Sequence, residues 1–344
     1  MAEFILDIED VKDLKMVKNL LKTLLLILVA VFFAMNMGAS GFAVSFAPSI
    51  GSNLIKRKRA LVIFTICVII GSLLVGGRVA KTLSSKIIAP GLINPDVILI
   101  ILIAACTSLF LANMLKIPQS TSIVTVGSFV GAGLYFKSIN LSLVAYLIVV
   151  WVSVSALSYF ITYWLARKVY PPTPENLRFY ERFFQHHGKL AKWTLFTDYY
   201  SAFGIGTNNV ANVVGPLMGA SLISPMPGFI MFSLLFGVGA FALGGGVIKT
   251  VSKEIVPLGV VSASLVSLIV STFIIGCSIL GLPAPYVQFS SMSILAIHTV
   301  KEEKNHSETL AHPITKKMLK IWVFTPILSI AVSYLLLNIF KVAR

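Results

Sequence analysis

The chain has 344 residues, of which 57% are hydrophobic and 12% charged, and its mean hydropathy is +0.90. This composition excludes an ordinary soluble globular domain and predicts an all-α, polytopic protein that spans the lipid bilayer. A net charge of +15 would suggest nucleic-acid binding in a soluble protein. Here the basic residues gather in loops, as the positive-inside rule describes, so we expect no nucleic acid as a partner.

The N-terminal segment, residues 1–19, carries five acidic residues within its first thirteen positions. This start differs from the basic start of a secretory signal peptide. Apolar residues recur at helical spacing from Phe4 to Leu14. Two interpretations stay open, an amphipathic helix at the membrane interface and a frayed tail.

A glycine-rich phrase that should break a helix occurs twice, 168 residues apart. It reads GASGFA from Gly38 and GTNNVA from Gly206, and Pro48 and Pro216 follow it at the same distance. Both copies lie where an apolar helix would otherwise continue. Matching interrupted segments in two halves of a membrane protein predict a transporter with its substrate site between the halves.

The charge pattern predicts the topology of these halves. We expect a first transmembrane repeat at 20–166, a cytoplasmic linker at 167–192 and a second repeat at 193–344. The basic run at 56–59 corresponds to uncharged residues at 224–227, so corresponding loops face opposite sides and the repeats are inverted. About five crossings per half place both termini outside the cell and make this a multi-pass protein of the plasma membrane.

The interrupted segments predict what is bound. Backbone that leaves a helix inside the bilayer must be buried in protein, because lipid offers it no hydrogen bonds. The half-helix after each break presents free N–H groups and the positive end of its dipole, which favours an anion. The substrate-binding candidates at the two breaks are Ser40, Gly41, Phe42, Asn208, Asn209 and Val210. The alternative is that the glycines serve only close helix packing.

A second motif starts at a proline in each half, at 117–122 and at 282–288. Hydroxyl groups just after a membrane proline can donate to a ligand, or they can merely cap a half-helix. The second copy has lost the hydroxyls, so the site should be asymmetric. The further substrate-binding candidates are Ser120, Thr121, Ser122 and Gln288.

Charged residues near the predicted site are few. Lys81 and Lys249 occupy matched Gly-x-x-x-Lys-Thr segments, with Arg78 beside the first, and would draw anions into a vestibule; snorkelling to the interface is the alternative for lysines at helix ends. The candidates for binding a coupling ion are Asp198, Glu254 and Asn212. Because no catalytic triad, phosphate-binding loop or ligand-spaced cluster is present in the sequence, we expect neither an enzyme nor a resident cofactor or metal.

Together, the paired glycine phrases, the Pro-x-Ser-Thr-Ser run and the Lys-Thr segments resemble the inorganic phosphate transporter (PiT) family over nearly the whole chain. The resemblance implies two inverted-topology repeats with discontinuous transmembrane helices and a central anion site. The family's hallmark reads Gly-Ala-Asn-Asp-x-Ala-Asn in both halves, but here Gly41 and Asn209 stand in the places of the two aspartates. The Gly-Ala-Ser-Gly phrase is similar to the sulfate permease branch of the family.

Losing both carboxylates favours sulfate. Phosphate carries a proton that a carboxylate can accept, whereas sulfate is fully ionised and needs donors only. The alternatives are a sodium- or proton-coupled phosphate transporter, a carrier of another oxyanion, and an anion channel. Importing a dianion against about 100 mV costs roughly 4.6 kcal/mol, so we expect symport with H+ or Na+, the proton being favoured. A homodimer is compatible with the sequence.

Overall fold

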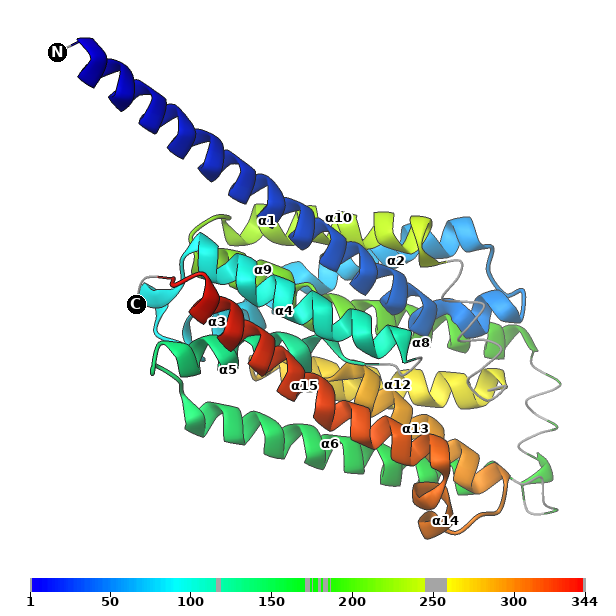
Figure 1. Ribbon diagram of the computed structural model, residues 1–344. Coiled ribbons are helices and arrows are strands. Elements are labelled where there is room, and N and C mark those ends of the chain that lie inside the picture. Colours follow the sequence, from blue (N-terminus) through cyan, green and yellow to red (C-terminus); the bar gives the residue numbers. More distant parts are fainter. Residues whose placement is uncertain are drawn as a thin grey trace.

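The computed structural model describes residues 2–115, 119–170, 187–244 and 259–342, with a few positions between 174 and 185. Among these residues it describes side chains from residue 16 on, except those of 113, 187 and 314. The described chain is helical, apart from one isolated bridge between Ile88 and Ile139 (Figure 1). The first half contains α1 (Ala2–Gly51), α2 (Arg57–Gly71), α3 (Gly77–Ser85), α4 (Pro95–Met114), α5 (Thr121–Tyr135) and α6 (Leu141–Arg167). The second contains α8 (His187–Asn208), α9 (Ala211–Gly219), α10 (Pro225–Ala242), α12 (Val260–Ile279), α13 (Tyr286–Lys301), α14 (His306–Ala311) and α15 (Pro313–Ile339).

The helices are long and apolar, as a membrane protein requires. Among the described residues, 7 helical stretches are long and apolar enough to cross a bilayer. They are Met16–Gly51, Arg57–Ser85, Pro95–Ala112, Leu141–Arg167, Pro225–Ala242, Val260–Ile279 and Thr315–Ile339. Helix α5 is apolar but shorter, as expected for a half-helix that starts at a proline motif.

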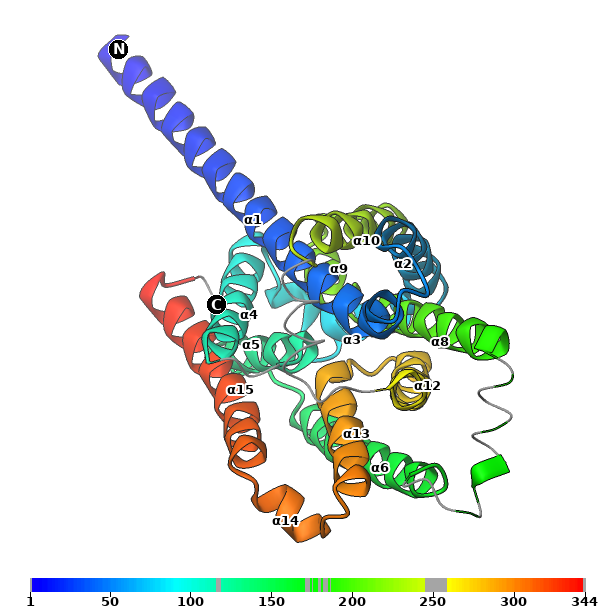
Figure 2. The same cartoon turned by 90° about the vertical axis from the view of Figure 1, so that its right-hand side faces the viewer.

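The two halves repeat one arrangement of helices. Adding 165 to the bounds of α4 gives those of α12, and the same offset carries the start of α5 to the start of α13. Helices of one half pack on helices of the other: α1 lies against α10, α2 against α8, α5 against α15 and α6 against α13 (Figure 2). Each half therefore buries part of its apolar surface against the other half.

Glycines allow the close approach of α1 to α10 and of α8 to α2. A Cβ on Gly38 would lie 2.2 Å from the carbonyl oxygen of Phe236, and one on Gly206 would lie 2.3 Å from that of Val68. These four positions form two pairs related by the offset of 168. Gly71 and Gly239, also 168 apart, approach the backbones of Phe203 and Met35 at 2.2 and 2.1 Å. Small residues that let helix backbones approach closely are the usual basis of association in membranes.

The predicted break in the first glycine phrase is wrong. Helix α1 continues through Gly38–Ala43 to Gly51 and contains Pro48. The glycines there make room for α10 and for the side chain of Ile205, 3.2 Å from a Cβ on Gly41, so the packing interpretation holds for this copy. Sequence alone could not separate the two, because glycine permits both a bend and a close contact.

The predicted break in the second phrase is confirmed. Helix α8 ends at Asn208 and α9 begins at Ala211. The amide of Asn209 still donates to the carbonyl of Ile205 at 2.8 Å, but that of Asn212 donates only three residues back, to Asn209, at 3.1 Å. The interruption is therefore short and tight. An unpredicted π-helical turn, Ser72–Gly76, joins α2 to α3.

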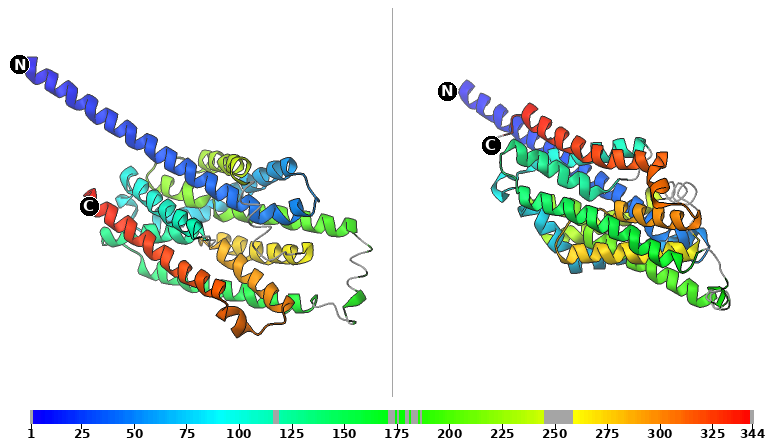
Figure 3. Two further views of the ribbon diagram at one scale, coloured as in Figure 1. Left: turned by 45° about the vertical axis from the view of Figure 1, so that its right-hand side comes forward. Right: turned by 90° about the horizontal axis from the view of Figure 1, so that it is seen from below.

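Two helices cross the boundaries of the expected segments. Helix α1 passes through residue 19 without interruption, and its N-terminal part extends beyond the bundle (Figure 3). Helix α8 begins at His187, inside the segment predicted as linker. The N-terminus and the C-terminus lie at the same end of the bundle (Figures 1 and 3).

Candidate functional site

Asn208, the last residue of α8, is the centre of a buried polar network. Its Nδ2 donates to Ser278 Oγ at 2.9 Å and to the carbonyl of Leu282 at 3.1 Å. Its Oδ1 accepts from the amide of Ala284 at 3.0 Å and from Ser122 Oγ at 3.3 Å. The side chain thus ties the end of α8 to the end of α12, the loop before α13 and the start of α5.

Asn212 extends this network by one helical turn. Its Nδ2 donates to Thr121 Oγ1 at 3.1 Å and to Ser122 Oγ at 3.0 Å. The residue is fully buried, and its Oδ1 has no hydrogen-bond partner. The structure therefore joins three residues predicted to bind substrate, Thr121, Ser122 and Asn208, with Asn212, predicted to bind the coupling ion.

Gln288 belongs to a second amide group beside the first. Its Nε2 donates to Gln119 Oε1 at 2.7 Å, and Gln119 in turn donates to the hydroxyl of Thr325 on α15. Gln288 Oε1 is buried without a partner. The two glutamines join the residue before Ser120 in the first half to the first turn of α13 in the second.

The first turns of α5 and α13 carry these side chains. Ser120 precedes α5 with extended backbone, φ −82° and ψ 132°, but its hydroxyl makes no capping bond. The hydroxyls of Thr121 and Ser122 bond the amides of Asn212 and Asn208 instead, so they do more than satisfy their own backbone. Because helix N-termini present free N–H groups and positive partial charge, the network suits an anion.

The network consists of amides and hydroxyls. Within the described part of the chain, no Asp or Glu is hydrogen-bonded to Asn208, Asn212, Gln119 or Gln288. Both Nδ2 hydrogens of Asn208 and of Asn212 are used inside the network, but Gln119 and Gln288 each use one Nε2 hydrogen and the Thr121 hydroxyl only accepts. These three groups keep N–H and O–H donors for an oxyanion without placing a negative charge beside it.

Ser40, Gly41 and Phe42 do not join this network. Ser40 is exposed on α1, and its hydroxyl donates to the carbonyl of Met37 at 3.0 Å. Phe42 packs in an aromatic cluster, with ring centroids 5.5 Å from Phe64. These residues lie in the unbroken helix α1 rather than at a break. The glycines around them serve helix packing.

Asn209 and Val210 form the break itself. Asn209 is half-buried and directly follows the last residue of α8. Val210 is fully buried in the hydrophobic core. Their backbone makes the short interruption between Asn208 and Asn212, whose side chains both contact the start of α5.

Two of the three predicted vestibule residues, Arg78 and Lys81, belong to the described part of the chain. Arg78 Nη1 donates to the carbonyl of Ile279 at 2.8 Å, which caps the C-terminus of α12. Lys81 is exposed, and Lys249 and Glu254 lie outside the described residues.

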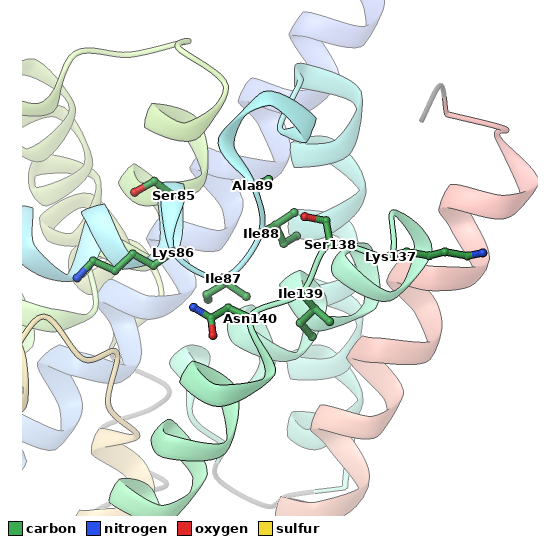
Figure 4. Close-up of a pocket in the computed structure, with 9 residues that line it drawn as sticks. All are labelled: Ser85, Lys86, Ile87, Ile88, Ala89, Lys137, Ser138, Ile139 and Asn140. Atoms are coloured by element: carbon green, nitrogen blue, oxygen red, sulfur yellow. The ribbon is translucent and has the colours of Figure 1, made fainter.

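A surface hollow of about 330 Å³ lies beyond α3, lined by Lys86 and Lys137 among others. Figure 4 shows the two ammonium groups pointing away from one another, so they do not converge on one anion.

Asp198 is buried ten residues before the end of α8. It is 1% exposed, its Oδ2 has no hydrogen-bond partner, and it forms no ion pair with any described residue. Sequence reasoning singled out Asp198 as a candidate for binding the coupling ion, and the structure buries its side chain. It missed Ser278 and Thr325, because single hydroxyls in apolar helices usually bond their own backbone, and it left out Gln119, although the proline motif contains it.

Comparison with known proteins decides the family. The model of the phosphate transporter family matches residues 37–192 and again residues 178–333, so each half of the chain is recognised separately. The chain belongs to the phosphate transporter family. The double match supports the repeat, and membership in a transporter family excludes an enzyme.

Relatives within this family carry both sulfate and phosphate names. The chain is 35% identical over 322 residues to "Sulfate permease CysP" of Bacillus subtilis, which covers 91% of this chain and 87% of that protein. It is 25% identical to a "Probable low-affinity inorganic phosphate transporter" of the same organism, over 93% of this chain and 98% of that protein. The fold matches a solved structure titled "The sodium-dependent phosphate transporter" with a TM-score of 0.75 at 19% identity, covering 94% of this chain and 100% of that one.

Proposed function

We propose that this protein is a secondary active transporter that imports sulfate together with a cation. The observation that carries the proposal is the buried network around Asn208, in which amides and hydroxyls meet two helix N-termini without a carboxylate. A fully ionised tetrahedral dianion needs such donors. The likeness to a sulfate permease over 91% of the chain supports the same substrate.

Gly41 and Asn209 stand where the family's two aspartates would distinguish phosphate from sulfate. A protonated phosphate donates a hydrogen bond to a carboxylate, whereas sulfate has no proton to donate and is repelled by the carboxylate. Phosphate stays the second candidate because another relative, matched over 93% of this chain, is named as a phosphate transporter.

Transport would proceed by alternating access. In the proposed topology the halves are inverted, with the anion held at the midplane between them, and they rock about it. The basic run at 56–59 and the linker at 167–192 face the cytoplasm and both termini face outward, which agrees with the termini lying at one end of the bundle. The predicted homodimer stays a prediction, which the mass of the detergent-purified protein would test.

Coupling to a cation follows from energetics. A dianion enters against a negative-inside potential of about 100 mV at a cost of roughly 4.6 kcal/mol, so uncoupled uptake would not concentrate it. We favour the proton over sodium because both hallmark aspartates are absent, and Asp198 is the proposed carrier.

The test is uptake of labelled sulfate into proteoliposomes that hold the purified protein, under an inward pH gradient. We expect concentrative uptake that excess phosphate and sodium leave unchanged. Sodium-stimulated phosphate uptake would refute the assigned substrate, and uptake that never exceeds equilibrium would indicate a channel.

A further inference from the structure

A second buried polar cluster surrounds Asp198, separate from the anion network. Ser201, one turn further along α8, shares hydrogen bonds with Ser45 Oγ of α1 at 3.1 Å and with the hydroxyl of Tyr286 at 2.8 Å. Ser49 of α1 lies against the Asp198 carboxylate, at a geometry that makes no regular hydrogen bond. The cluster therefore joins α1, α8 and α13.

Three oxygen atoms in this region are buried without a partner. They are Asp198 Oδ2, Ser49 Oγ and Ser271 Oγ, and Ser271 lies beside the hydroxyl of Tyr286. A buried carboxylate that lacks a counter-charge is costly, and the cost falls when it takes up a proton or a cation. Unsatisfied hydroxyls next to it point to the same ligand.

The charge of the cluster around Asp198 suits one monovalent cation. The described groups that face Asp198 are hydroxyls: Ser49 of α1, Tyr286 of α13 and the neighbouring Tyr199. Helix α2 also packs against α8. Its residue Cys67 faces Tyr199. With one carboxylate and no described basic residue in contact, the cluster balances a single positive charge.

The backbone around the cluster favours a proton over sodium. Sodium sites in transporters draw on carbonyl groups of unwound helix, whereas Asp198, Ser45 and Ser271 lie inside helices that are regular over these positions. The exception is the carbonyl of Val44, which loses its helical donor at Pro48. A proton needs only the carboxylate and neighbouring hydroxyls.

Tyr286 connects this cluster to the anion network. Its hydroxyl bonds Ser201, one turn from Asp198, and its backbone begins α13, whose first turn also carries Gln288. At 1.5 Å per residue, Asp198 lies about 15 Å along α8 from Asn208. The first turn of α13 therefore contributes Tyr286 to one cluster and Gln288 to the other.

We propose that Asp198, with the hydroxyls of Ser45, Ser49, Ser201 and Tyr286, forms the proton site of this transporter, and that Tyr286 couples it to the anion site. This inference rests on the proposed function, sulfate import driven by protons. On loading, a carboxylate oxygen of Asp198 gains one proton, and on release it returns to the carboxylate. Each hydroxyl in the chain accepts one proton and passes one on, so no other group changes its charge.

The experiment uses the full-length protein in proteoliposomes with the membrane potential held at zero. One coupled proton then gives about tenfold sulfate accumulation per unit of pH gradient. Sulfate exchange without a gradient is measured on the same vesicles. We expect Tyr286→Phe and Asp198→Asn to lower the ratio of gradient-driven accumulation to exchange about tenfold, and to flatten the pH profile of exchange.

Tyr200→Phe is the matched control. Tyr200 lies on the same helix, and its hydroxyl bonds Thr272 on an exposed face at 3.3 Å, so its ratio should equal that of the wild type. An unchanged ratio in Tyr286→Phe, or a parallel loss of accumulation and exchange, would overturn the assignment. A sodium requirement that disappears in Asp198→Asn would overturn the proton as the bound cation. Absence of accumulation by the wild type would instead refute the proposed function.

Discussion

Replacing Asn208 with alanine should destabilise the protein more than any neighbouring substitution at the break. The side chain makes four hydrogen bonds that join α8 to α12, α5 and the loop before α13. At about 0.6 kcal/mol for each bond between membrane helices, the four sum to about 2.4 kcal/mol. The buried amide of Ala284 would lose its partner, which adds about 1–3 kcal/mol, so we expect a total of about 3–5 kcal/mol.

Thermal melting of the detergent-solubilised protein, followed by size-exclusion chromatography, measures this loss. At roughly 2 °C per kcal/mol for a long chain, Asn208→Ala should melt about 6–10 °C below the wild type. Asn209→Ala is the control, because the same residue type one position later has no side-chain hydrogen bond among those described and is half-buried. Equal melting temperatures for the two variants would refute the role of Asn208 as the centre of the network.

Three further predictions concern packing, selectivity and steering. Gly38→Ala should reduce the yield of folded protein sharply, since a Cβ would lie 2.2 Å from the backbone of α10, whereas Gly276→Ala, with nothing within 4 Å, should express normally; equal yields would contradict the close contact. Asn209→Asp should weaken sulfate uptake and strengthen inhibition by phosphate, because it adds a carboxylate at the break; unchanged competition would place this position outside the substrate site. Lys81→Gln should raise the apparent KM for sulfate at low ionic strength but not at high, whereas Lys86→Gln should leave it unchanged, and a salt-independent effect would exclude steering.

The repeat was predictable from the sequence, but the role of its glycines in packing was not. Composition and the offset of 168 predicted a helical membrane protein with two related halves, and the family matches at 37–192 and 178–333 agree. The role of Gly38 was not predictable, because the backbone of Phe236, which it contacts, belongs to the other half. Pairings between halves are not encoded in any local pattern.

Only part of the candidate site was predictable, because some of its contacts also depend on tertiary packing. Asn208 and the run Thr121-Ser122 stood out because amides and hydroxyls beside helix breaks are unusual in apolar sequence. Ser278 and Thr325 looked like ordinary helical hydroxyls, and each indeed donates to a carbonyl four residues back, at 2.8 Å. Their second role, accepting from an amide of the network, depends on tertiary packing.

The helix packing of this protein is repeated in both halves, but its polar clusters are not. The glycine contacts between α1 and α10 recur between α2 and α8 at the offset of 168, so both halves keep the same packing. The polar clusters do not recur: the positions that correspond to Asp198 and Ser49 are Ala30 and Leu217, which are both apolar. Two equivalent halves would have to load and release protons in the same way. With the proposed proton site confined to the contact between α1 and α8, the rocking motion is coupled to one protonation event. A symmetric scaffold can then change its substrate or its coupling ion by substitution in one half, without loss of the contacts that hold both halves together.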